Sequence, residues 1–424
     1  MDYLVLPRAR EVRGEVRAPG SKSATNRALI LAAMSAVPVE IGTPLESGDT
    51  AVLLECLMAM GARGRAAAGG LRLGGPLGAD PARETALDVA DSGTAARFLA
   101  AVCTAVPGRF RLDGSARLRE RPMEELVAAL RSGGAEIACL EREGHLPLAI
   151  AGATLAAGDL AVDASRSSQF LSALLLAAVA VDGGLTVRAT GPVVSAPYVA
   201  STLEALTAFG HAARRDGASF VVRRGERPPH RYEVPGDDSS ALPLLAGAGA
   251  VGGRVTVRGV RPDSTAADAR AFPVLERMGV AIARGADGAT ASFSGRRLAA
   301  VEVDAADFPD AVPALAALAA MAEGESRFTG VAHLRLKESD RIAALAALVA
   351  AAGGSARADE VELVVVGGLR GEGLARLPTA RDHRIAMAAG LLAIARGGCL
   401  IEDPGCVAKS YPGFFRDLAG LCVR

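Results

Sequence analysis

Cysteine, histidine and tryptophan are scarce in this chain of 424 residues, which has six cysteines, five histidines and no tryptophan. The closest two cysteines are Cys399 and Cys406, and none forms a Cys-x-x-Cys pair. Six cysteines in a chain of this length do not make a disulfide scaffold, so we expect reduced thiols and a cytoplasmic protein. The histidines lie far apart in the sequence, and no zinc site is expected.

The chain also lacks an excess of charge and a long apolar segment. It has 47 basic and 47 acidic residues, whereas a general binder of nucleic acid or membrane surfaces needs an excess of basic charge. The apolar run at 171–181 is too short to span a bilayer, and we expect no signal peptide. Nucleic acid and membrane are therefore not expected partners, and any anion site must be a local group of Lys and Arg.

What the sequence does have is a repeating pattern. An amphipathic helix that ends at glycine recurs six times, about 70 residues apart. Glycine suits the left-handed residue that follows many helices. The six segments are Leu53–Gly61, Leu126–Gly133, Leu203–Gly210, Phe272–Gly279, Ile342–Gly353 and Phe414–Gly420.

A second, more apolar helix recurs in each unit and begins with small polar residues that suit the N-cap. The six starts are Ser21-Lys22-Ser23, Ser92-Gly93-Thr94, Ser167-Ser168, Ser239-Ser240, Asp307 and Asp382-His383. A strand is expected after each, at Val37–Ile41, Arg109–Leu112, Leu185–Arg188, Arg254–Arg258, Ser326–Phe328 and Cys399–Ile401. The pattern predicts an α/β fold of six units, with buried apolar helices and sheets outside them.

The length of the chain indicates more than one domain, and three units plus three is the natural division. The extended stretch Val234–Asp237 is a candidate crossing between domains, and Ala18–Gly20 is a second one. We therefore predict a first domain of residues 19–236 and a second domain of residues 1–18 and 237–424.

Charged side chains gather at several predicted helix starts. Backbone N–H groups at a helix start favour an anion, and Lys22 and Arg27 add positive charge to the first one. A solvated basic helix start is the alternative interpretation. Asp310 and Glu338 stand near other starts, where a carboxyl group can transfer protons or simply form salt bridges. If the units wrap alike, their helix starts can converge on one face.

These segments resemble one family, the 3-phosphoshikimate 1-carboxyvinyltransferases, also known as EPSP synthases. The resemblance runs nearly end to end and includes Gly-Ser-Lys-Ser at 20–23, Lys-Glu-Ser-Asp-Arg at 337–341 and Asp-His-Arg at 382–384. It implies a two-domain inverted α/β barrel of six βαβαββ repeats, three per domain, with helices inside, sheets outside and the active site formed by closure of the domains. It also implies that no metal or organic cofactor is needed, and we expect a monomer.

The implied reaction transfers the enolpyruvyl group of phosphoenolpyruvate to the 5-hydroxyl of shikimate 3-phosphate, on the shikimate pathway to chorismate and aromatic amino acids. The resemblance implies that shikimate 3-phosphate contacts Ser23, Arg27, Ser167, Ser168, Gln169, Ser195, Tyr198, Asp310 and Lys337. It implies that phosphoenolpyruvate contacts Lys22, Gly93, Thr94, Arg121, Gln169, Arg341, Arg384 and Lys409. Several cations suit a substrate that carries a phosphate and a carboxylate on adjacent atoms.

Catalysis is expected from Asp310, Glu338 and Lys22. Asp310 would accept the hydroxyl proton, and Glu338, with Lys22 nearby, would protonate the methylene carbon of phosphoenolpyruvate. The chain departs from the family pattern at Asp91, Ala196 and His333, where Asn, Lys and Asn respectively are usual. We keep His333 among the expected binding residues, and Asp91 would add negative charge near the phosphoenolpyruvate site.

Two alternatives remain open. The sister enzyme that transfers enolpyruvyl to UDP-N-acetylglucosamine shares the fold and the donor, but it usually has a reactive cysteine near the Arg121 region, and 113–122 contains none. A repeat protein that only binds an anionic metabolite is expected to lose Asp310 and Glu338, and both are present.

Overall fold

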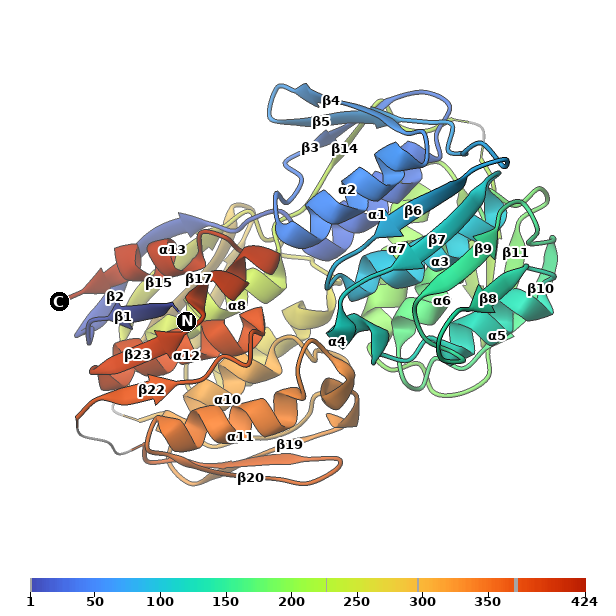
Figure 1. Cartoon of the computed structure of the whole chain (residues 1–424). Helices are drawn as coiled ribbons and strands as arrows, with labels where there is room; N and C mark the ends of the chain where they lie inside the picture. The colour runs from blue at the N-terminus through green and yellow to red at the C-terminus, as the bar shows by residue number, and fades with distance from the viewer. Residues whose placement is uncertain (1, 226, 296, 370–372) are drawn as a thin grey trace. The chain divides into compact units, whose positions relative to one another are not determined.

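The computed structural model describes residues 2–225, 227–295, 297–369 and 373–424. Contacts divide the chain into two compact units (Figure 1). The central unit is Gly20–Val234, and the terminal unit is Met1–Pro19 together with Pro235–Arg424. Each unit contains three of the six sheets among the described residues.

Two repeats of the central unit have the same order and direction of strands. In the first, β6 and β7 are parallel, and β9 is antiparallel to both β7 and β8, which gives the order β6-β7-β9-β8. In the second, the order β10-β11-β13-β12 repeats this arrangement. The elements are β6 (Glu84–Asp88), α3 (Gly93–Ala105), β7 (Arg109–Asp113), α4 (Ala116–Arg119), α5 (Glu124–Ser132), β8 (Ile137–Cys139) and β9 (Leu148–Ala151), then β10 (Gly158–Val162), α6 (Ser168–Ala177), β11 (Leu185–Ala189), α7 (Ala196–Ala208), β12 (Ala212–Asp216) and β13 (Ser219–Arg223).

The remaining repeat of the central unit takes its first strand from the far end of that unit. Its sheet has the order β14-β3-β5-β4, and β14 runs parallel to β3. The elements are α1 (Lys22–Ala33), β3 (Val39–Gly42), α2 (Gly48–Ala59), β4 (Arg63–Ala67), β5 (Gly70–Gly74) and β14 (Arg231–Glu233). The strand β2 (Glu11–Arg17), which precedes α1 in the chain, pairs instead with β15 of the terminal unit.

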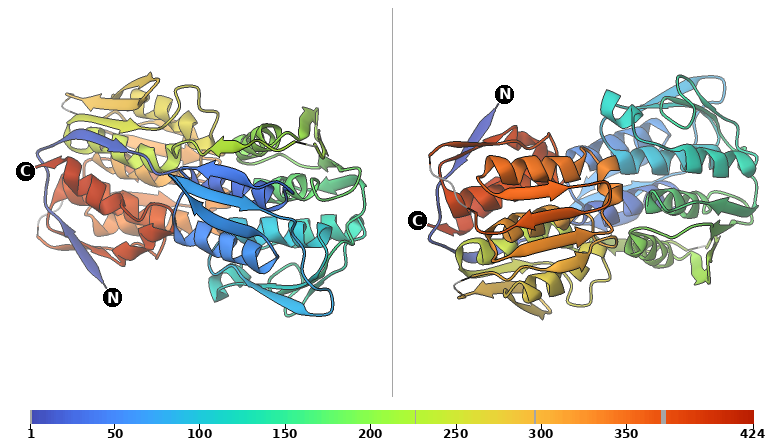
Figure 2. Two further views of the ribbon diagram at one scale, coloured as in Figure 1. Left: turned by 90° about the horizontal axis from the view of Figure 1, so that it is seen from above. Right: turned by 90° about the horizontal axis from the view of Figure 1, so that it is seen from below.

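The terminal unit completes its sheets with segments from both ends of the chain, as the blue strands beside red and yellow elements show (Figures 1 and 2). Its sheets have the orders β16-β17-β15-β2-β24, β18-β19-β21-β20 and β1-β23-β22. The elements are β1 (Tyr3–Leu6), α8 (Asp238–Val251), β15 (Gly253–Arg258), η1 (Ala267–Ala271), α9 (Phe272–Arg277), β16 (Ala281–Gly285), β17 (Gly288–Phe293), β18 (Glu302–Asp304), α10 (Val312–Met321), β19 (Glu325–Thr329), η2 (Ala332–Leu336), α11 (Arg341–Ala351), β20 (Ser355–Ala358), β21 (Leu363–Val366), β22 (Ala375–Leu377), α12 (His383–Arg396), β23 (Cys399–Glu402), η3 (Pro404–Lys409), α13 (Phe414–Leu421) and β24 (Cys422–Val423).

The more apolar helix of each repeat lies in the core. Helices α1, α3 and α6 are buried over most of their length in the central unit, as are α8, α10 and α12 in the terminal unit. A helix that is apolar on all sides must be covered on all sides, and the sheets cover them. The predicted α/β fold with inner helices and outer sheets is therefore confirmed. No helix among the described residues is long and apolar enough to cross a membrane.

One of the predicted glycine stops is wrong, and at another the left-handed residue lies one position later than predicted. The residue with positive φ after α5 is Gly134, at 85°, and Gly133 is the C-cap with a φ of −87°. Gly420 lies inside α13, which runs to Leu421 because the chain continues directly into β24 beside β2. Left-handed glycines follow the other four helices as predicted, at Gly61, Gly210, Gly279 and Gly353.

The helix predicted to begin at Asp307 begins five residues later, at Val312. Pro313 lies in its first turn, where a missing N–H costs nothing because that group has no partner inside the helix. Asp307 is not a cap, and its carboxylate instead accepts a hydrogen bond of 2.7 Å from Arg270. This shift leaves Asp310 in the turn before the helix rather than in its first turn.

Candidate functional site

The predicted site residues occupy helix starts and the loops before them. Those in the central unit are Lys22, Ser23 and Arg27 on α1, Gly93 and Thr94 on α3, Arg121 between α4 and α5, Ser167, Ser168 and Gln169 at the start of α6, and Ser195 and Tyr198 at the start of α7. Those in the terminal unit are Asp310 before α10, His333 on η2, Lys337 and Glu338 before α11, Arg341 on α11, Arg384 on α12 and Lys409 on η3.

The first helix of the central unit presents its lysine next to a buried carboxylate. Ser21 caps α1 by accepting a hydrogen bond from the backbone N–H of Ala24. The Lys22 ammonium lies 3.1 Å from Asp49, whose side chain is only 6% exposed. Asp49 lies in the first turn of α2, where acidic residues are common because they interact favourably with the helix dipole. Its ion pair with Lys22 could therefore not be predicted from the sequence.

Arg27 contacts two other residues expected to bind shikimate 3-phosphate, Ser23 and Tyr198. Its guanidinium donates to the Ser23 carbonyl at 2.9 Å, to the Tyr198 carbonyl at 2.8 Å and to the Thr202 hydroxyl at 2.8 Å. It also lies over the Phe98 ring, 5.3 Å from the centroid. Burial lowers the pKa of Arg27 to about 10, so it still carries its charge at neutral pH. The hydrogen bonds hold that charge at one place beside α7.

Ser195 has an unusual backbone at the start of α7. Its φ of 52° and ψ of 42° are left-handed, a conformation that costs a residue other than glycine about 1–3 kcal/mol. It is also buried, with 4% of its surface exposed. Strained residues of this kind cluster at binding sites because the surrounding structure holds them there.

A second group in the central unit joins α3, α6 and the Arg121 loop. The Gln169 side-chain amide donates to the Thr94 hydroxyl at 3.1 Å. Arg121 packs so closely on Gly93 that a Cβ built at this glycine would lie 2.4 Å from Nη1 of the arginine. Arg97, which was not predicted as a site residue, donates to the carbonyl oxygen of Gly93 at 3.2 Å.

Arg97 also supports the Arg121 loop, since it donates to the Pro122 carbonyl at 3.0 Å. It is buried on the inner helix α3, where only its charge among apolar neighbours could have singled it out.

Asp91, where the chain departs from the family pattern, is exposed and accepts a hydrogen bond from the Ser115 hydroxyl.

The terminal unit contains a buried network around Arg341, which is 1% exposed. Its guanidinium donates to Asp382 at 2.8 Å, to Asp310 at 2.6 Å and to Glu338 at 2.9 Å. Burial lowers the pKa of Arg341, but the charges of Asp382, Glu338 and Asp310 outweigh burial and raise it well above its ordinary value. The Lys409 ammonium lies 3.6 Å from Glu338. Both predicted catalytic carboxylates therefore share one arginine.

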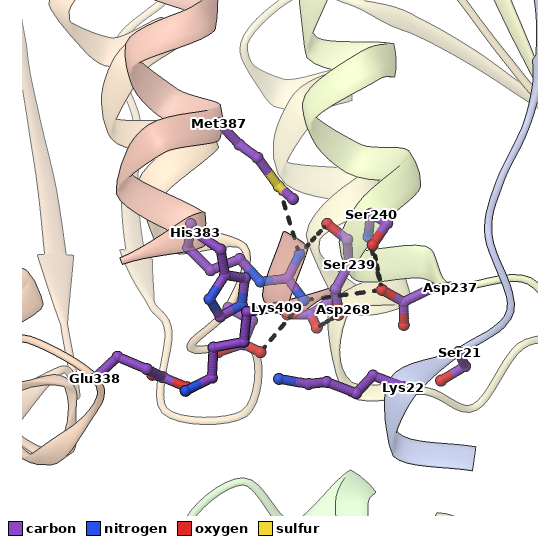
Figure 3. Close-up of polar contacts among 12 residues, drawn as sticks. Ser21, Lys22, Asp237, Ser239, Ser240, Asp268, Glu338, His383, Met387 and Lys409 are labelled. Atoms are coloured by element: carbon purple, nitrogen blue, oxygen red, sulfur yellow. Dashed lines mark hydrogen bonds and ion pairs between the residues drawn. The ribbon is translucent and has the colours of Figure 1, made fainter. Parts of the chain in front are cut away.

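Arg384 forms the neighbouring part of this network, and its partners Ser239, Met387 and Asp237 are labelled in Figure 3. It donates to the Ser239 carbonyl at 2.8 Å and contacts Met387 Sδ at 4.0 Å. Its Nη2 lies 3.5 Å from Asp310 and 3.8 Å from Asp237. Burial acts to lower the pKa of Arg384, and the surrounding carboxylates, Asp310 first, raise it above the ordinary value. Asp310 thus lies between two guanidinium groups.

Two carboxylates of this network were not predicted as site residues. Asp382 was predicted only as a helix start, and Asp237 only as part of a crossing between domains. Asp382 caps α12 by accepting from the Arg384 N–H, and Asp237 caps α8 by accepting from the Ser240 N–H. Each also forms an ion pair with an arginine, Asp382 with Arg341 and Asp237 with Arg384. The N-cap pattern accounts for the first contact of each and does not reveal the second.

His333 is buried and neutral at physiological pH. Burial, with a smaller contribution from the Lys337 charge, lowers its pKa to about 3. It therefore offers hydrogen bonds rather than charge to a ligand. No group of three or more His, Cys, Asp or Glu among the described residues could hold a metal ion.

The fold and the buried groups of Arg, Lys and carboxylate at the helix starts define a protein of the enolpyruvyl transferase class. The enolpyruvyl transferase NikO from Streptomyces tendae shares the fold, with a TM-score of 0.79 at 21% identity over 99% of this chain and 97% of that one. An EPSP synthase from Acinetobacter baumannii has a TM-score of 0.80 at 26% identity over 100% of this chain and 99% of its own.

Sequence comparisons narrow the class further. The family model described as EPSP synthase (3-phosphoshikimate 1-carboxyvinyltransferase) matches residues 7–418. A 3-phosphoshikimate 1-carboxyvinyltransferase from Thermococcus kodakarensis is 42% identical over 97% of this chain and 98% of the relative. One from Nitrosomonas europaea is 37% identical over 99% of both chains. The chain belongs to the EPSP synthase family, as its resemblance predicted, and is a transferase.

Proposed function

We propose that this protein transfers the enolpyruvyl group of phosphoenolpyruvate to the 5-hydroxyl of shikimate 3-phosphate, with release of phosphate. The product would be 5-enolpyruvylshikimate 3-phosphate, on the shikimate pathway to chorismate and aromatic amino acids. Family membership over residues 7–418 supports this function, and so does the network in which Arg341 holds both Asp310 and Glu338. UDP-N-acetylglucosamine is not favoured as the acceptor, because the relatives carry the phosphoshikimate name.

Binding of two anionic substrates requires several cations. Phosphoenolpyruvate is assigned to Lys22, Gly93, Thr94, Arg121, Gln169, Arg341, Arg384 and Lys409. Shikimate 3-phosphate is assigned to Ser23, Arg27, Ser167, Ser168, Gln169, Ser195, Tyr198, Asp310 and Lys337, with His333 as a further binding residue. Arginine can grip a phosphate or carboxylate with two parallel hydrogen bonds, whereas lysine acts as a point charge. Residues 19–236 would form the domain that mainly binds shikimate 3-phosphate, and 1–18 with 237–424 the other.

The proposed chemistry is an addition followed by an elimination. Asp310 accepts the proton of the 5-hydroxyl, and its ion pairs with two arginines suit the carboxylate form that a base needs. Glu338, assisted by Lys22, delivers a proton to the methylene carbon of phosphoenolpyruvate. The hydroxyl oxygen bonds to C2 to give a tetrahedral intermediate. This intermediate then loses phosphate, whose charge the cations stabilise, while its methyl group returns a proton to Glu338 and the carbon–carbon double bond forms again. No cofactor takes part in this scheme, and the protein would act as a monomer in the cytoplasm.

Phosphate release tests the proposal. The purified protein is incubated with shikimate 3-phosphate and phosphoenolpyruvate together, and with each alone. We expect phosphate only when both are present, and a product with the mass of 5-enolpyruvylshikimate 3-phosphate. Turnover with UDP-N-acetylglucosamine in place of shikimate 3-phosphate would instead support the sister enzyme, and no release with either acceptor would reject an enolpyruvyl transferase.

A further inference from the structure

A buried carboxylate outside the expected site lies next to Arg384. Asp268 on η1 is only 1% exposed. It accepts a hydrogen bond from the Ser239 hydroxyl (Figure 3). The backbone carbonyl of the same Ser239 accepts from Arg384 Nη1 at 2.8 Å. Asp268 is therefore connected to Arg384 through a single residue.

The charges around Asp268 do not balance if it is ionised. Asp237 faces it from the start of α8, Asp310 from the turn before α10, and Arg384 from α12. On its own element Arg270 is exposed and pairs with Asp307. Three carboxylates would then surround the Arg384 guanidinium, while Asp310 is shared with another arginine.

The proton affinity of Asp268 reflects this crowding. Burial, then the charge of Asp310, raises its pKa to about 7, although Arg384 and the Ser239 hydroxyl act in the opposite direction. Asp268 therefore holds a proton more readily than an ordinary aspartate does. The neutral form leaves more of the charge of Arg384 to a ligand, because only Asp310 and Asp237 then compensate it.

We propose that Asp268 is a positioning residue that controls how much positive charge Arg384 offers to phosphoenolpyruvate, and that it takes up a proton from solvent when this anion binds. The inference rests on the proposed function. A bound anion next to Asp268 disfavours its ionised form, so binding and proton uptake favour each other. Phosphoenolpyruvate then binds less tightly as the pH rises through the ionisation of Asp268.

The test compares the unaltered protein with Asp268→Asn, which keeps an oxygen to accept from Ser239 but cannot ionise. The KM for phosphoenolpyruvate and kcat are measured from pH 6 to 9 at saturating shikimate 3-phosphate. We expect the ratio of the two KM values to change by up to about tenfold per pH unit above the ionisation, the limit for one coupled proton. The substrate phosphate ionises near pH 6, but this affects both proteins equally and cancels in the ratio.

Asp238→Asn is the matched control. Asp238 is a buried carboxylate of the same unit, and burial raises its pKa to about 6, but its hydroxyl partner is Ser264. Asp238→Asn should therefore show the same pH dependence of the KM for phosphoenolpyruvate as the unaltered protein. Ser239→Ala keeps the backbone carbonyl that holds Arg384 and removes the hydroxyl that lowers the pKa of Asp268. It should move the rise in KM to higher pH.

A structural role alone would shift KM or kcat without changing their pH dependence. The inference is wrong if Asp268→Asn retains the parent profile, or, should that variant not fold, if Ser239→Ala does. It is also wrong if Asp238→Asn alters the profile as Asp268→Asn does. Absence of phosphate release in the unaltered protein would reject the proposed function instead, so the two failures are distinguishable.

Discussion

Asp310 contacts two guanidinium groups, Arg341 at 2.6 Å and Arg384 at 3.5 Å. Asp310→Asn keeps the size of the side chain and removes its capacity to take the hydroxyl proton. We expect kcat to fall by about 10²–10⁴-fold, the usual contribution of a positioned base. Binding of phosphoenolpyruvate should survive, because both arginines remain and lose a competing carboxylate. Steady-state kinetics and equilibrium binding measure the two effects separately.

Asp307→Asn is the control for this variant. Asp307 lies three residues earlier and forms an exposed ion pair with Arg270, so its replacement should leave kcat unchanged. Glu338→Gln should also reduce turnover, since Glu338 is held by Arg341 at 2.9 Å and Lys409 at 3.6 Å. Near-normal turnover in both Asp310→Asn and Glu338→Gln would remove the acid–base scheme.

Gly93 is a position where a single methyl group should weaken phosphoenolpyruvate binding. The added Cβ of Gly93→Ala would lie 2.4 Å from Nη1 and 2.8 Å from Cζ of Arg121, so the guanidinium must move. Loss of one charged hydrogen bond costs about 1.5–3 kcal/mol, which predicts a roughly 10- to 100-fold higher KM for phosphoenolpyruvate. The KM for shikimate 3-phosphate should change little.

The control for Gly93→Ala is another glycine in the first turn of a helix. Gly48 begins α2, and a Cβ built there would have nothing within 4 Å. Gly48→Ala should therefore leave both KM values unchanged. An unchanged phosphoenolpyruvate KM in Gly93→Ala would show that Arg121 does not grip this substrate.

Single residues also mark the limit of what the sequence could predict about the site. Lys22, Arg121, Arg341 and Arg384 stand out because a cation at a helix start favours an anion. The carboxylates that hold them could not be identified in the same way, because Asp49 and Asp382 belong to segments 27 and 41 residues away from their partners. Such pairs depend on the packing of separate helices, which local sequence does not specify.

At the scale of elements, caps and periodicity predicted which helices and strands exist, and they failed where the chain continues into another element. Five inner helices begin within two residues of their predicted starts, because Ser and Asp side chains bond to the first free N–H groups. The sixth, α10, begins five residues after its predicted start, at Val312, with Pro313 in its first turn. Gly420 failed as a stop because pairing with β2 extends the chain beyond it.

Two glycines near the ends of the amphipathic helices should respond oppositely to the same substitution. Gly353 follows α11 with a φ of 90°, which an alanine adopts only with strain, so Gly353→Ala should lower the free energy of unfolding by about 1 kcal/mol or more. Gly420 lies inside α13, and a Cβ there would have nothing within 4 Å. Gly420→Ala should raise the free energy of unfolding by about 0.5–1 kcal/mol.

Urea unfolding followed by circular dichroism measures both changes. The two variants serve as controls for each other, since each adds one methyl group near the end of an outer helix. Equal shifts in the same direction would mean that backbone conformation does not decide the effect at these positions.

At the scale of the whole molecule, the predicted division of the chain places residues 1–18 with residues 237–424 but does not say which strand lies beside β3 in the central unit. The strand that leads into α1 pairs in the terminal unit, and β14 takes the corresponding place beside β3 in the central unit. The sequence pattern identifies both segments as extended. It does not identify their partner strands, because the paired residues lie far apart in the chain: Arg231 lies opposite Glu40, more than 190 residues away. The exchange makes the sheets of each unit complete within that unit.

The exchange predicts that residues 20–234 fold without the rest of the chain. All strands of the three central sheets come from this segment, and its core cluster runs from Ala28 to Val234 without a residue of the terminal unit. The fragment should therefore show the circular dichroism of a mixed α/β protein and a single cooperative thermal transition. It should release no phosphate, because it lacks Asp310, Arg341 and Arg384.

A fragment of residues 20–229 is the decisive comparison, because it differs only by the loss of β14 and the residues beside it. Without β14 the strand β3 has an unpaired edge, and Val234 and Tyr232 no longer cover the core. Burial of apolar surface contributes about 25 cal/mol per Å², so loss of this strand should lower the melting temperature clearly or abolish the transition. If both fragments melt alike, the exchanged strand is not what completes the central unit. If neither folds, the stability of the central unit depends on the terminal unit.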